Sequence, residues 1–299
     1  MTARAATRLL ACALAAFVAG CAQLVPQTVA LRSEWPQGVP QTVELKSVPF
    51  FPQDDYQCGP AALATVLAYS GVDITPDPLV KQVFVPARKG SLQLEMLAAP
   101  RTYGRVSYEL APKYDDLLRE VAAGNPVVVL QDVSLMSPFI AEWHYAVVNG
   151  FDYPSGTIYL RSGKTERQEM PFSYFEREWM AGKYWAMVVT PPGRIPATAS
   201  EDRWVNAVIA MSRVGGADAA LKGYEAALKR WPGDLPAMIG LANLHNDHGE
   251  HARAISILRD AQAKHPQSAI VTNNLAQALS DAGRNSEALA QIDKISDPQ

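Results

Sequence analysis

The sequence predicts an α+β domain followed by an all-α solenoid of helical repeats. In residues 44–190 helices come first and strands joined by hairpin turns come after, a pattern typical of α+β domains. From residue 201 onward, small residues and prolines recur with a period of 34 residues. The length of 299 residues also suits two folding units of about 100–200 residues each.

Composition and charge limit the classes of protein to consider. Hydrophobic residues make up 48% of the chain and charged residues 19%, so sizeable cores are expected. The net charge is −3 with both signs dispersed, which does not favour nucleic acid or another strongly charged partner. The sequence has no Gly-rich phosphate loop, zinc signature or basic patch. We therefore expect no cofactor, no metal site and no nucleic-acid partner.

The first 20 residues are predicted to be a targeting segment. Arg4 and Arg8 form a basic region, and the apolar run 9–20 is too short for a membrane span of about 20 apolar residues. Small residues precede Cys21, an arrangement that resembles a bacterial lipobox. The resemblance implies that the signal is cleaved and that Cys21 carries lipid. Ala22 after the cysteine favours, by the lipoprotein sorting rule, the periplasmic face of the outer membrane. The alternative is an ordinary cleaved signal in which Cys21 is incidental.

The segment after the signal and the first domain are then predicted in order. Residues 21–43 are rich in Pro, Gln and Val without a clear period and are predicted to be a tether. Hydrophobic periodicity and Gly or Pro breakers define the elements of the domain at 44–190. The predicted elements are a strand at 43–48, a helix at 58–69, short helices within 76–104, a strand at 105–110, a helix at 114–123, strands at 127–131, 144–150 and 157–161, a short helix at 174–180 and a strand at 184–190. Residues 191–200 are a linker by composition.

Residues 201–299 are predicted to be about three helical repeats, at 201–234, 235–268 and, incomplete, 269–299. The residues in register are Gly215, Gly249 and Gly283; Ala220, Ala254 and Ala288; and Pro232 and Pro266. Small residues let helices cross closely, glycine fits the turn, and proline ends the second helix. The pattern resembles the tetratricopeptide repeat, which implies a groove that docks a protein partner or substrate. The alternative is an ordinary helical bundle.

Cys58 is the cysteine that neither the signal nor the lipid accounts for. Cys12 leaves with the signal, so Cys58 has no partner for a disulfide within the chain. Pro60 marks a helix start, which places Cys58 at the positive end of the helix dipole. We expect this position to lower the pKa of the thiol and to favour a nucleophilic thiolate. The alternative is a buried cysteine that acts as a small hydrophobic residue.

A nucleophilic cysteine needs a base, and His144 is the histidine in the same domain. It opens an apolar strand, from which its ring can face a helix N-terminus. The other four histidines lie in the repeats, where His245, His248 and His251 straddle a turn and are not expected to bind metal. The alternative for His144 is a structural histidine.

Gln53, the run Cys58-Gly59-Pro60 and the strand beginning with His144 together resemble the papain-like bacteriocin-processing (double-glycine leader) peptidase family. The resemblance covers roughly residues 44–190 and implies a papain-like cysteine peptidase fold. It also implies that Cys58 attacks the substrate, that His144 is the base, and that Gln53 and the backbone N–H of Cys58 form the oxyanion hole. No ATP-binding motif follows, so cleavage after paired glycines is not carried over from the family.

The third catalytic position departs from the family pattern. The family usually has an acidic residue on the strand after the histidine strand, where this chain has Arg161-Ser162-Gly163. Asp152 is eight residues from His144, which is roughly 26 Å along a strand. If the hairpin turns near residues 153–156, Ser162 returns close to His144 and could orient its ring. Ser162 is therefore the candidate for this role, and the activity is expected to be weakened by the missing negative charge.

The sequence favours a lipid-anchored periplasmic cysteine peptidase that cleaves a peptide or protein through Cys58 and His144. Its partners would be the substrate, a protein docked on the repeats, and the membrane through Cys21. The alternative is a non-catalytic peptide-binding scaffold of the cell envelope, which the missing acidic residue favours. The sequence does not distinguish acyl transfer by the same pair of residues from hydrolysis.

Overall fold

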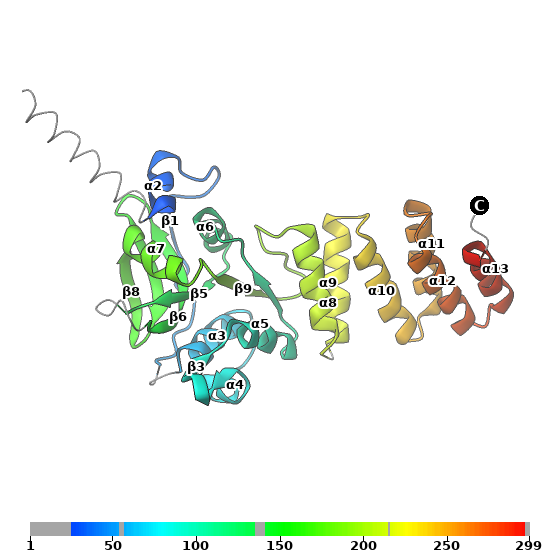
Figure 1. The fold of residues 1–299 in the computed structure, drawn as a ribbon, viewed down its shortest axis with the longest axis horizontal. Coiled ribbons are helices and arrows are strands. Elements are labelled where there is room, and N and C mark those ends of the chain that lie inside the picture. The colour runs from blue at the N-terminus through cyan, green and yellow to red at the C-terminus, as the bar shows by residue number, and fades with distance from the viewer. Residues whose placement is uncertain (1–24, 54–56, 135–140, 215, 297–299) are drawn as a thin grey trace, which may run out of the picture. The chain divides into compact units, whose positions relative to one another are not determined.

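The computed structural model describes residues 25–53, 57–134, 141–214 and 216–296. The chain divides into two compact units (Figure 1), of which the first contains Met1–Leu97 and Glu109–Val188 and the second Ala98–Tyr108 and Val189–Gln299. Residues 1–20 and Cys21, to which the signal and lipid were assigned, lie outside the described residues. Within the described ranges, no helix combines the length and the apolar character that membrane crossing requires.

The elements up to residue 190 largely follow the predicted order, with most helices before the consecutive strands of the sheet. The helices are α2 (Pro26–Ser33), α3 (Cys58–Tyr69), α4 (Pro76–Val83), the short 3₁₀ helix η1 (Pro86–Arg88), α5 (Gln93–Thr102), α6 (Tyr114–Ala122) and α7 (Phe172–Ala181). The strands are β1 (Thr42–Glu44), β2 (Phe84–Val85), β3 (Gly90–Ser91), β4 (Val106–Glu109), β5 (Val127–Asp132), β6 (Trp143–Asp152), β7 (Thr157–Ser162), β8 (Thr165–Pro171) and β9 (Ala186–Thr190).

Among the described residues, the main sheet has seven strands, in the order β4-β9-β5-β6-β7-β8, with β1 paired to β6 outside this path. The pairings of β6 with β5, β7 and β1 are all antiparallel. β5 and β6 are almost continuously buried, because α3 packs against β5, β6 and β7 while α7 packs against β5, β7 and β8. Strands covered on both faces lose the polar alternation of a half-exposed sheet, which explains their mostly apolar sequences.

Helix α3 is the central helix of this unit. Nine consecutive residues, 59–67, are buried, so the helix is apolar on every side rather than amphipathic. Pro60 stands in its first turn, where the missing N–H costs nothing. Gly59 is required because a Cβ there would lie 2.6 Å from the Cβ of Ser91. The helix begins at Cys58, as predicted, and its N-terminus is therefore held tightly against β3 and β6.

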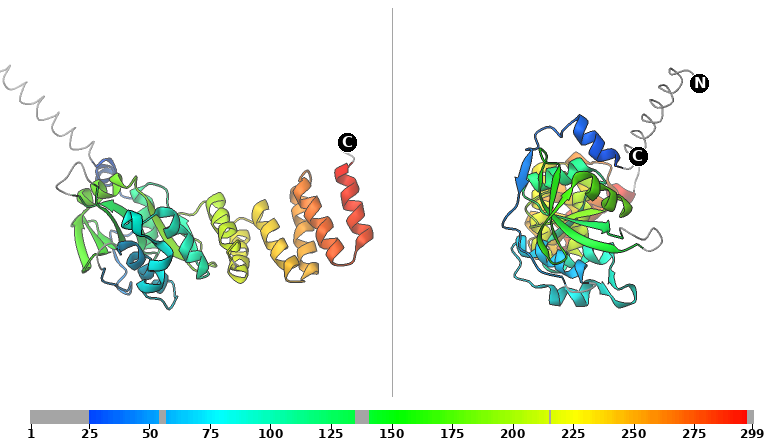
Figure 2. Two further views of the ribbon diagram at one scale, coloured as in Figure 1. Left: turned by 60° about the horizontal axis from the view of Figure 1, so that its bottom comes forward. Right: turned by 90° about the vertical axis from the view of Figure 1, so that its left-hand side faces the viewer.

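Residues 26–33, which the sequence analysis assigned to a tether, form helix α2. The buried carboxylate of Glu176 accepts hydrogen bonds from the backbone N–H groups of Gln27 (2.8 Å) and Thr28 (2.6 Å) at the start of α2. These N–H groups have no partner within the helix, and a negative charge there is stabilising. Leu31 is only 2% exposed. α2 and α4 lie at opposite ends of the first unit in both Figure 1 and Figure 2.

Within its described residues, the second unit contains six helices of the repeat region. They are α8 (Glu201–Ser212), α9 (Ala217–Arg230), α10 (Leu235–Asp247), α11 (His251–Lys264), α12 (Ala269–Asp281) and α13 (Asn285–Ser296). Consecutive helices pack in pairs, as the repeat pattern predicts. Gly249 and Gly283 take the left-handed conformation, with φ of +75° and +74°, in the turns between paired helices. His245, close to the turn between α10 and α11, is buried, and its Nδ1 lies 2.6 Å from Glu250 Oε2.

The close crossing of α8 and α9 gives a testable prediction. A Cβ on Gly223 would lie 2.8 Å and 2.9 Å from the two γ-carbons of Val208, which is fully buried. Glycine to alanine inside a helix normally stabilises by about 1 kcal/mol, but Gly223→Ala is expected to destabilise the repeats by about 1–3 kcal/mol through overpacking. Urea unfolding followed by circular dichroism would measure it. Gly233→Ala, which meets nothing within 4 Å, is the control; equal effects would contradict the prediction.

Candidate active site

Cys58 is the first residue of α3 and lies next to β6. Its thiol is free and partly buried. The thiol interacts with the backbone N–H groups of Tyr145, Gly59 and Cys58, all of which favour a negative charge on sulfur. Tyr145 directly follows His144 in β6. The structure therefore places the sulfur of Cys58 beside the peptide group that joins His144 to Tyr145.

The pKa of Cys58 differs from the sequence expectation. Burial of the thiol raises its pKa above the usual value of 9.0, and the three N–H groups reduce this rise without reversing it. The expectation of a lowered pKa, made from the helix start, is therefore wrong. The backbone N–H groups at the start of α3 do lower the pKa of Cys58, as predicted. The desolvation caused by β6 and its neighbours raises that pKa by more. At neutral pH the resting group is a thiol.

His144 occupies the second position of β6, and its Nε2 lies 3.0 Å from Ser162 Oγ. Burial lowers the pKa of His144 from 6.5 to about 4, so the imidazole is neutral at neutral pH. A serine hydroxyl can both donate and accept a hydrogen bond, so Ser162 can pair with either neutral tautomer. A carboxylate could only accept, and would select the tautomer with the proton on Nε2. Ser162 thus holds the ring without selecting one of the two neutral tautomers.

The proximity of Ser162 to His144 follows from the hairpin that the sequence predicted. β6 and β7 pair in antiparallel register up to Asp152 and Thr157, so the turn lies between those two residues. Asp152 is at the far end of β6, where its carboxylate accepts a hydrogen bond from Thr42 Oγ1 at 2.7 Å. The geometry thus excludes Asp152 from the surroundings of His144, while the catalytic role of Ser162 stays a prediction.

Gln53 is 8% exposed and lies beside the end of β7. Its backbone N–H donates to the carbonyl oxygen of Gly163 at 3.0 Å. Gly163 directly follows Ser162, so two consecutive residues hold the Gln53 segment and the ring of His144. Residues 54–56, which connect Gln53 to the start of α3, lie outside the described residues. The assignment of the Gln53 carboxamide to the oxyanion hole also stays a prediction.

Several neighbours of the site were not found from the sequence. Asp132 Oδ1 accepts hydrogen bonds from Ser134 N–H (3.0 Å), Ser134 Oγ (2.6 Å) and Glu142 N–H (3.0 Å), and so fastens both ends of the connection that precedes β6. The Tyr145 hydroxyl donates to Ser91 O at 3.3 Å and thereby ties β6 to β3. Arg161 is buried in β7. Arg161 could have been noticed in the sequence as a charged residue within an apolar strand.

The buried neutral His144 predicts a specific dependence of stability on pH. Its pKa is 6.5 in the unfolded chain and about 4 in the folded one, so the unfolded state binds the proton more readily. The contribution is complete above pH 6.5 and is lost as the pH falls from 6.5 to 4. We expect about 3 kcal/mol of destabilisation from this group. Denaturant unfolding at pH 7 and pH 4 should show a smaller pH effect for His144→Gln than for the wild type; equal effects would contradict it.

Comparisons with known proteins agree with this fold. Residues 45–187 match the model of the Peptidase C39 like family, and residues 209–269 and 245–299 match two tetratricopeptide repeat models. The chain therefore carries a C39-like peptidase domain of α+β fold followed by a run of tetratricopeptide repeats, as the sequence analysis predicted. No curated protein sequence matches the chain.

Solved structures similar to the chain include C39-like peptidase domains. A C39-like protein from Bacillus anthracis is 18% identical, with a TM-score of 0.43, and the match covers 50% of this chain and 98% of the other. The peptidase domain of Streptococcus ComA, a bi-functional ABC transporter involved in a quorum sensing pathway, is 19% identical, with a TM-score of 0.39, covering 48% and 98%. The same domain of Streptococcus mutans ComA is also 19% identical, with a TM-score of 0.32 and the same coverage.

Proposed function

We propose that the protein is a cysteine peptidase in which Cys58 attacks a peptide carbonyl and His144 is the base. The observation that carries the proposal is the position of the Cys58 sulfur, beside the peptide group between His144 and Tyr145 at the N-terminus of α3. A free thiol held by backbone N–H groups next to a histidine is an arrangement suited to nucleophilic catalysis. The C39-like domain supports the same conclusion.

The pKa values indicate when the proton moves. Both groups are neutral at rest, because burial raises the pKa of Cys58 and lowers that of His144. His144 would take the thiol proton as the sulfur–carbon bond forms, and would then give it to the leaving amine. Gln53 and the N–H of Cys58 would stabilise the oxyanion. Water, deprotonated by His144, would attack the acyl-enzyme and release the acid, returning the proton to Cys58.

We also propose that the protein is a lipoprotein held by Cys21 on the periplasmic face of the outer membrane. The residues between Cys21 and α2 number four, 22–25, and α2 is fastened to the domain by Glu176. A chain extends at most about 3.6 Å per residue, so the start of α2 would lie within roughly 18 Å of the anchor. The domain would be kept close to the membrane. Fatty-acid labelling that persists in Cys21→Ser would contradict the anchor.

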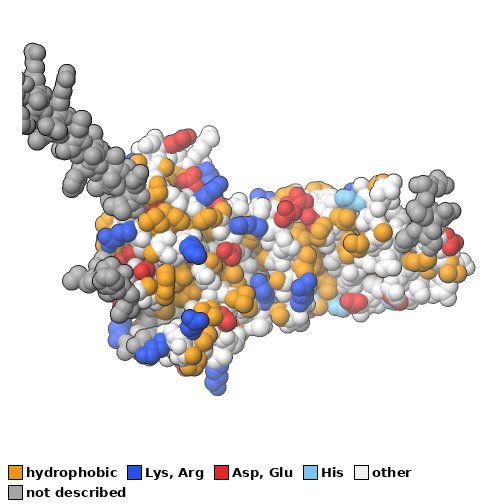
Figure 3. Space-filling model, in the orientation of Figure 1, with side chains coloured by type: hydrophobic (Ala, Val, Ile, Leu, Met, Phe, Trp, Pro, Cys, Tyr) orange, Lys and Arg blue, Asp and Glu red, His pale blue; other side chains and the backbone are white. Residues whose placement is uncertain are grey.

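The repeats are proposed to dock the protein substrate or a protein partner, as tetratricopeptide repeats generally do. On the face seen in Figure 3, basic and acidic side chains are interspersed along the chain. A partner recognised through a large charge of one sign is therefore not favoured by this face.

A non-catalytic peptide-binding scaffold is the second candidate. It is favoured by the raised pKa of Cys58, by the pKa of about 4 at His144 and by a serine in place of the family's acidic residue. In this alternative the C39-like domain would recognise a peptide without cutting it, and Cys58 would react no faster than an ordinary buried thiol.

The test uses protein lacking residues 1–23 and the activated ester p-nitrophenyl acetate. A peptidase site should show a burst of nitrophenolate equal to the protein concentration, an acetyl group on Cys58 by mass spectrometry, and then turnover. Cys58→Ala is the control. Acylation no faster than that of a free thiol with the same fraction of thiolate would favour the scaffold. An added amine that captures the acyl group faster than water would indicate acyl transfer.

A further inference from the structure

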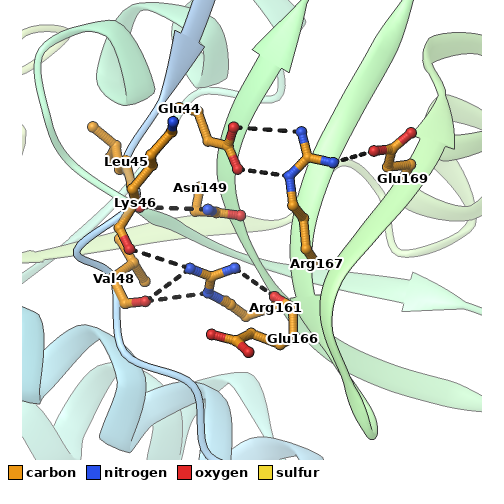
Figure 4. A network of polar contacts seen from close by, with 9 residues as sticks. All are labelled: Glu44, Leu45, Lys46, Val48, Asn149, Arg161, Glu166, Arg167 and Glu169. Carbon is orange, nitrogen blue, oxygen red and sulfur yellow. Dashed lines mark hydrogen bonds and ion pairs between the residues drawn. The ribbon is translucent and has the colours of Figure 1, made fainter.

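Arg161 carries a buried positive charge whose hydrogen bonds go to the backbone. Its side chain, in β7, is 6% exposed. Nε and Nη2 donate to the carbonyl oxygen of Val48 at 3.2 Å and 3.1 Å, Nη2 also reaches Lys46 O at 3.5 Å, and Nη1 donates to Glu166 O (Figure 4). Among the described residues, no carboxylate lies within ion-pair distance of this guanidinium.

This arrangement is unusual because burying a charge is unfavourable unless close partners compensate it. Carbonyl oxygens supply strong hydrogen bonds to a guanidinium but no opposite charge, and the carboxylate of Glu44 acts on Arg161 only from beyond ion-pair distance. An apolar side chain of similar volume would fill the same place in β7 without this cost. The guanidinium of Arg161 therefore has a role beyond packing. Its hydrogen bonds indicate that it fixes the backbone conformation at residues 46–48.

Three consecutive residues at the end of β7 hold three parts of the candidate site. Arg161 binds the carbonyl of Val48, Ser162 binds the ring of His144, and Gly163 accepts the backbone N–H of Gln53. Val48 and Gln53 mark the two ends of the segment 48–53. Arg161 and Gly163 thus fasten this segment at both ends to the last residues of β7 and the turn that follows it.

We propose that Arg161 is a positioning residue that sets the place of Gln53 relative to Cys58. The inference rests on the proposed peptidase function, in which Gln53 donates to the oxyanion. Arg161 itself does not touch the substrate. Its hydrogen bonds to Val48 hold the start of the segment, so the Gln53 side chain is presented from a fixed backbone. The β7–β8 hairpin then holds both the oxyanion donor Gln53 and the base His144, and so fixes their positions relative to each other.

Two reactions of Cys58 separate this role from a general structural one. Acylation by p-nitrophenyl acetate passes through an oxyanion and needs Gln53, whereas alkylation by iodoacetamide forms no oxyanion and reports the supply of thiolate alone. We expect Arg161→Met to slow acylation about tenfold or more and to leave alkylation within about twofold, in the same direction as Gln53→Ala. The variant Arg161→Lys, which keeps the charge but loses the fork, is expected to fall between the wild type and Arg161→Met.

Arg167→Met is the matched control. Arg167 lies in β8 in the same network of Figure 4, but its guanidinium binds the carboxylates of Glu44 and Glu169 at the surface. Its removal is expected to leave both reactions unchanged. If Arg161 acts through Gln53, the double variant of Arg161→Met with Gln53→Ala should be no slower in acylation than Gln53→Ala alone.

Several results would overturn the inference. These are unchanged acylation in Arg161→Met, equal loss of acylation and alkylation, additive losses in the double variant, or failure of both Arg161 variants to fold by circular dichroism, which would make the residue structural. A wild type that acylates no faster than a free thiol is a different failure, because it overturns the proposed function and the inference with it.

Discussion

His144→Ala is expected to slow acylation of Cys58 by p-nitrophenyl acetate about 100-fold at pH 7. General bases contribute about 10²–10⁴-fold, and the pKa of about 4 makes His144 a weak base, so the lower end of this range applies. Because the resting imidazole is neutral, it gives no charge stabilisation to a thiolate. Its removal should therefore leave the pH midpoint of iodoacetamide alkylation unchanged, or lower it as the thiol becomes better hydrated.

For His144→Ala, the decisive measurement is whether the pH midpoint of alkylation rises or falls relative to the wild type. A preformed thiolate–imidazolium pair would give a low midpoint in the wild type and a rise in His144→Ala. The structure predicts a wild-type midpoint above the usual thiol value, since burial raises the pKa of Cys58. His248→Ala, at an exposed histidine of the repeats, is the control and should match the wild type in both reactions. A midpoint that rises in His144→Ala would contradict the neutral pair.

Ser162→Asp is expected to raise the pKa of His144 and to increase the rate of acylation at pH 7 at least about tenfold. Ser162 Oγ is 3.0 Å from Nε2, so a carboxylate at this position would face the ring directly. An opposite charge at this distance typically shifts a pKa by 1–3 units. It would also select the tautomer that leaves the other ring nitrogen free to accept a proton. A stronger and correctly oriented base should then deprotonate the thiol more readily.

Proton magnetic resonance of the histidine ring would follow this change, with His144→Ala used to assign the signal. Ser162→Ala removes the hydroxyl without adding charge, and should lower the acylation rate while leaving the ring neutral. An unchanged His144 pKa in Ser162→Asp would contradict the contact, and a raised pKa without faster acylation would contradict the role of His144 as the base.

Several elements of the fold could be predicted because their signals are local. Helix α3 has the predicted bounds, since Pro60 marks its first turn and the alanine-rich run that follows favours a helix. The strands β5, β6 and β7 were found from their apolar runs, and the repeats from the period of 34 residues. The hairpin between β6 and β7 brought Ser162 back to His144, which strand geometry alone was enough to anticipate.

Two of the missed elements, α2 and β8, depend for their stability on distant residues. α2 has eight residues, too few to be stable alone, and its start is held by Glu176, which lies about 150 positions later in the chain. β8 is polar and charged on most positions, which suits the outer strand next to β7 but does not produce an apolar pattern. In both cases the partner that stabilises the element is not visible in the neighbouring sequence.

The candidate site shows the same difference between features with a local signal and features that depend on distant residues. Residue types and spacing selected Cys58, His144 and Ser162 as candidates, because a helix start, a lone histidine on a strand and a hairpin are local features. Gln53 was selected only through the resemblance to the peptidase family. The pKa of Cys58 could not be obtained in this way. Its sign depends on a competition between the N-terminus of α3, which is local, and burial by β6 and its neighbours, which exists only after folding. The hydrogen bonds of Arg161 likewise join segments that meet only in the folded sheet, since hydrogen bonds and desolvation depend on distances in space rather than on positions in the chain.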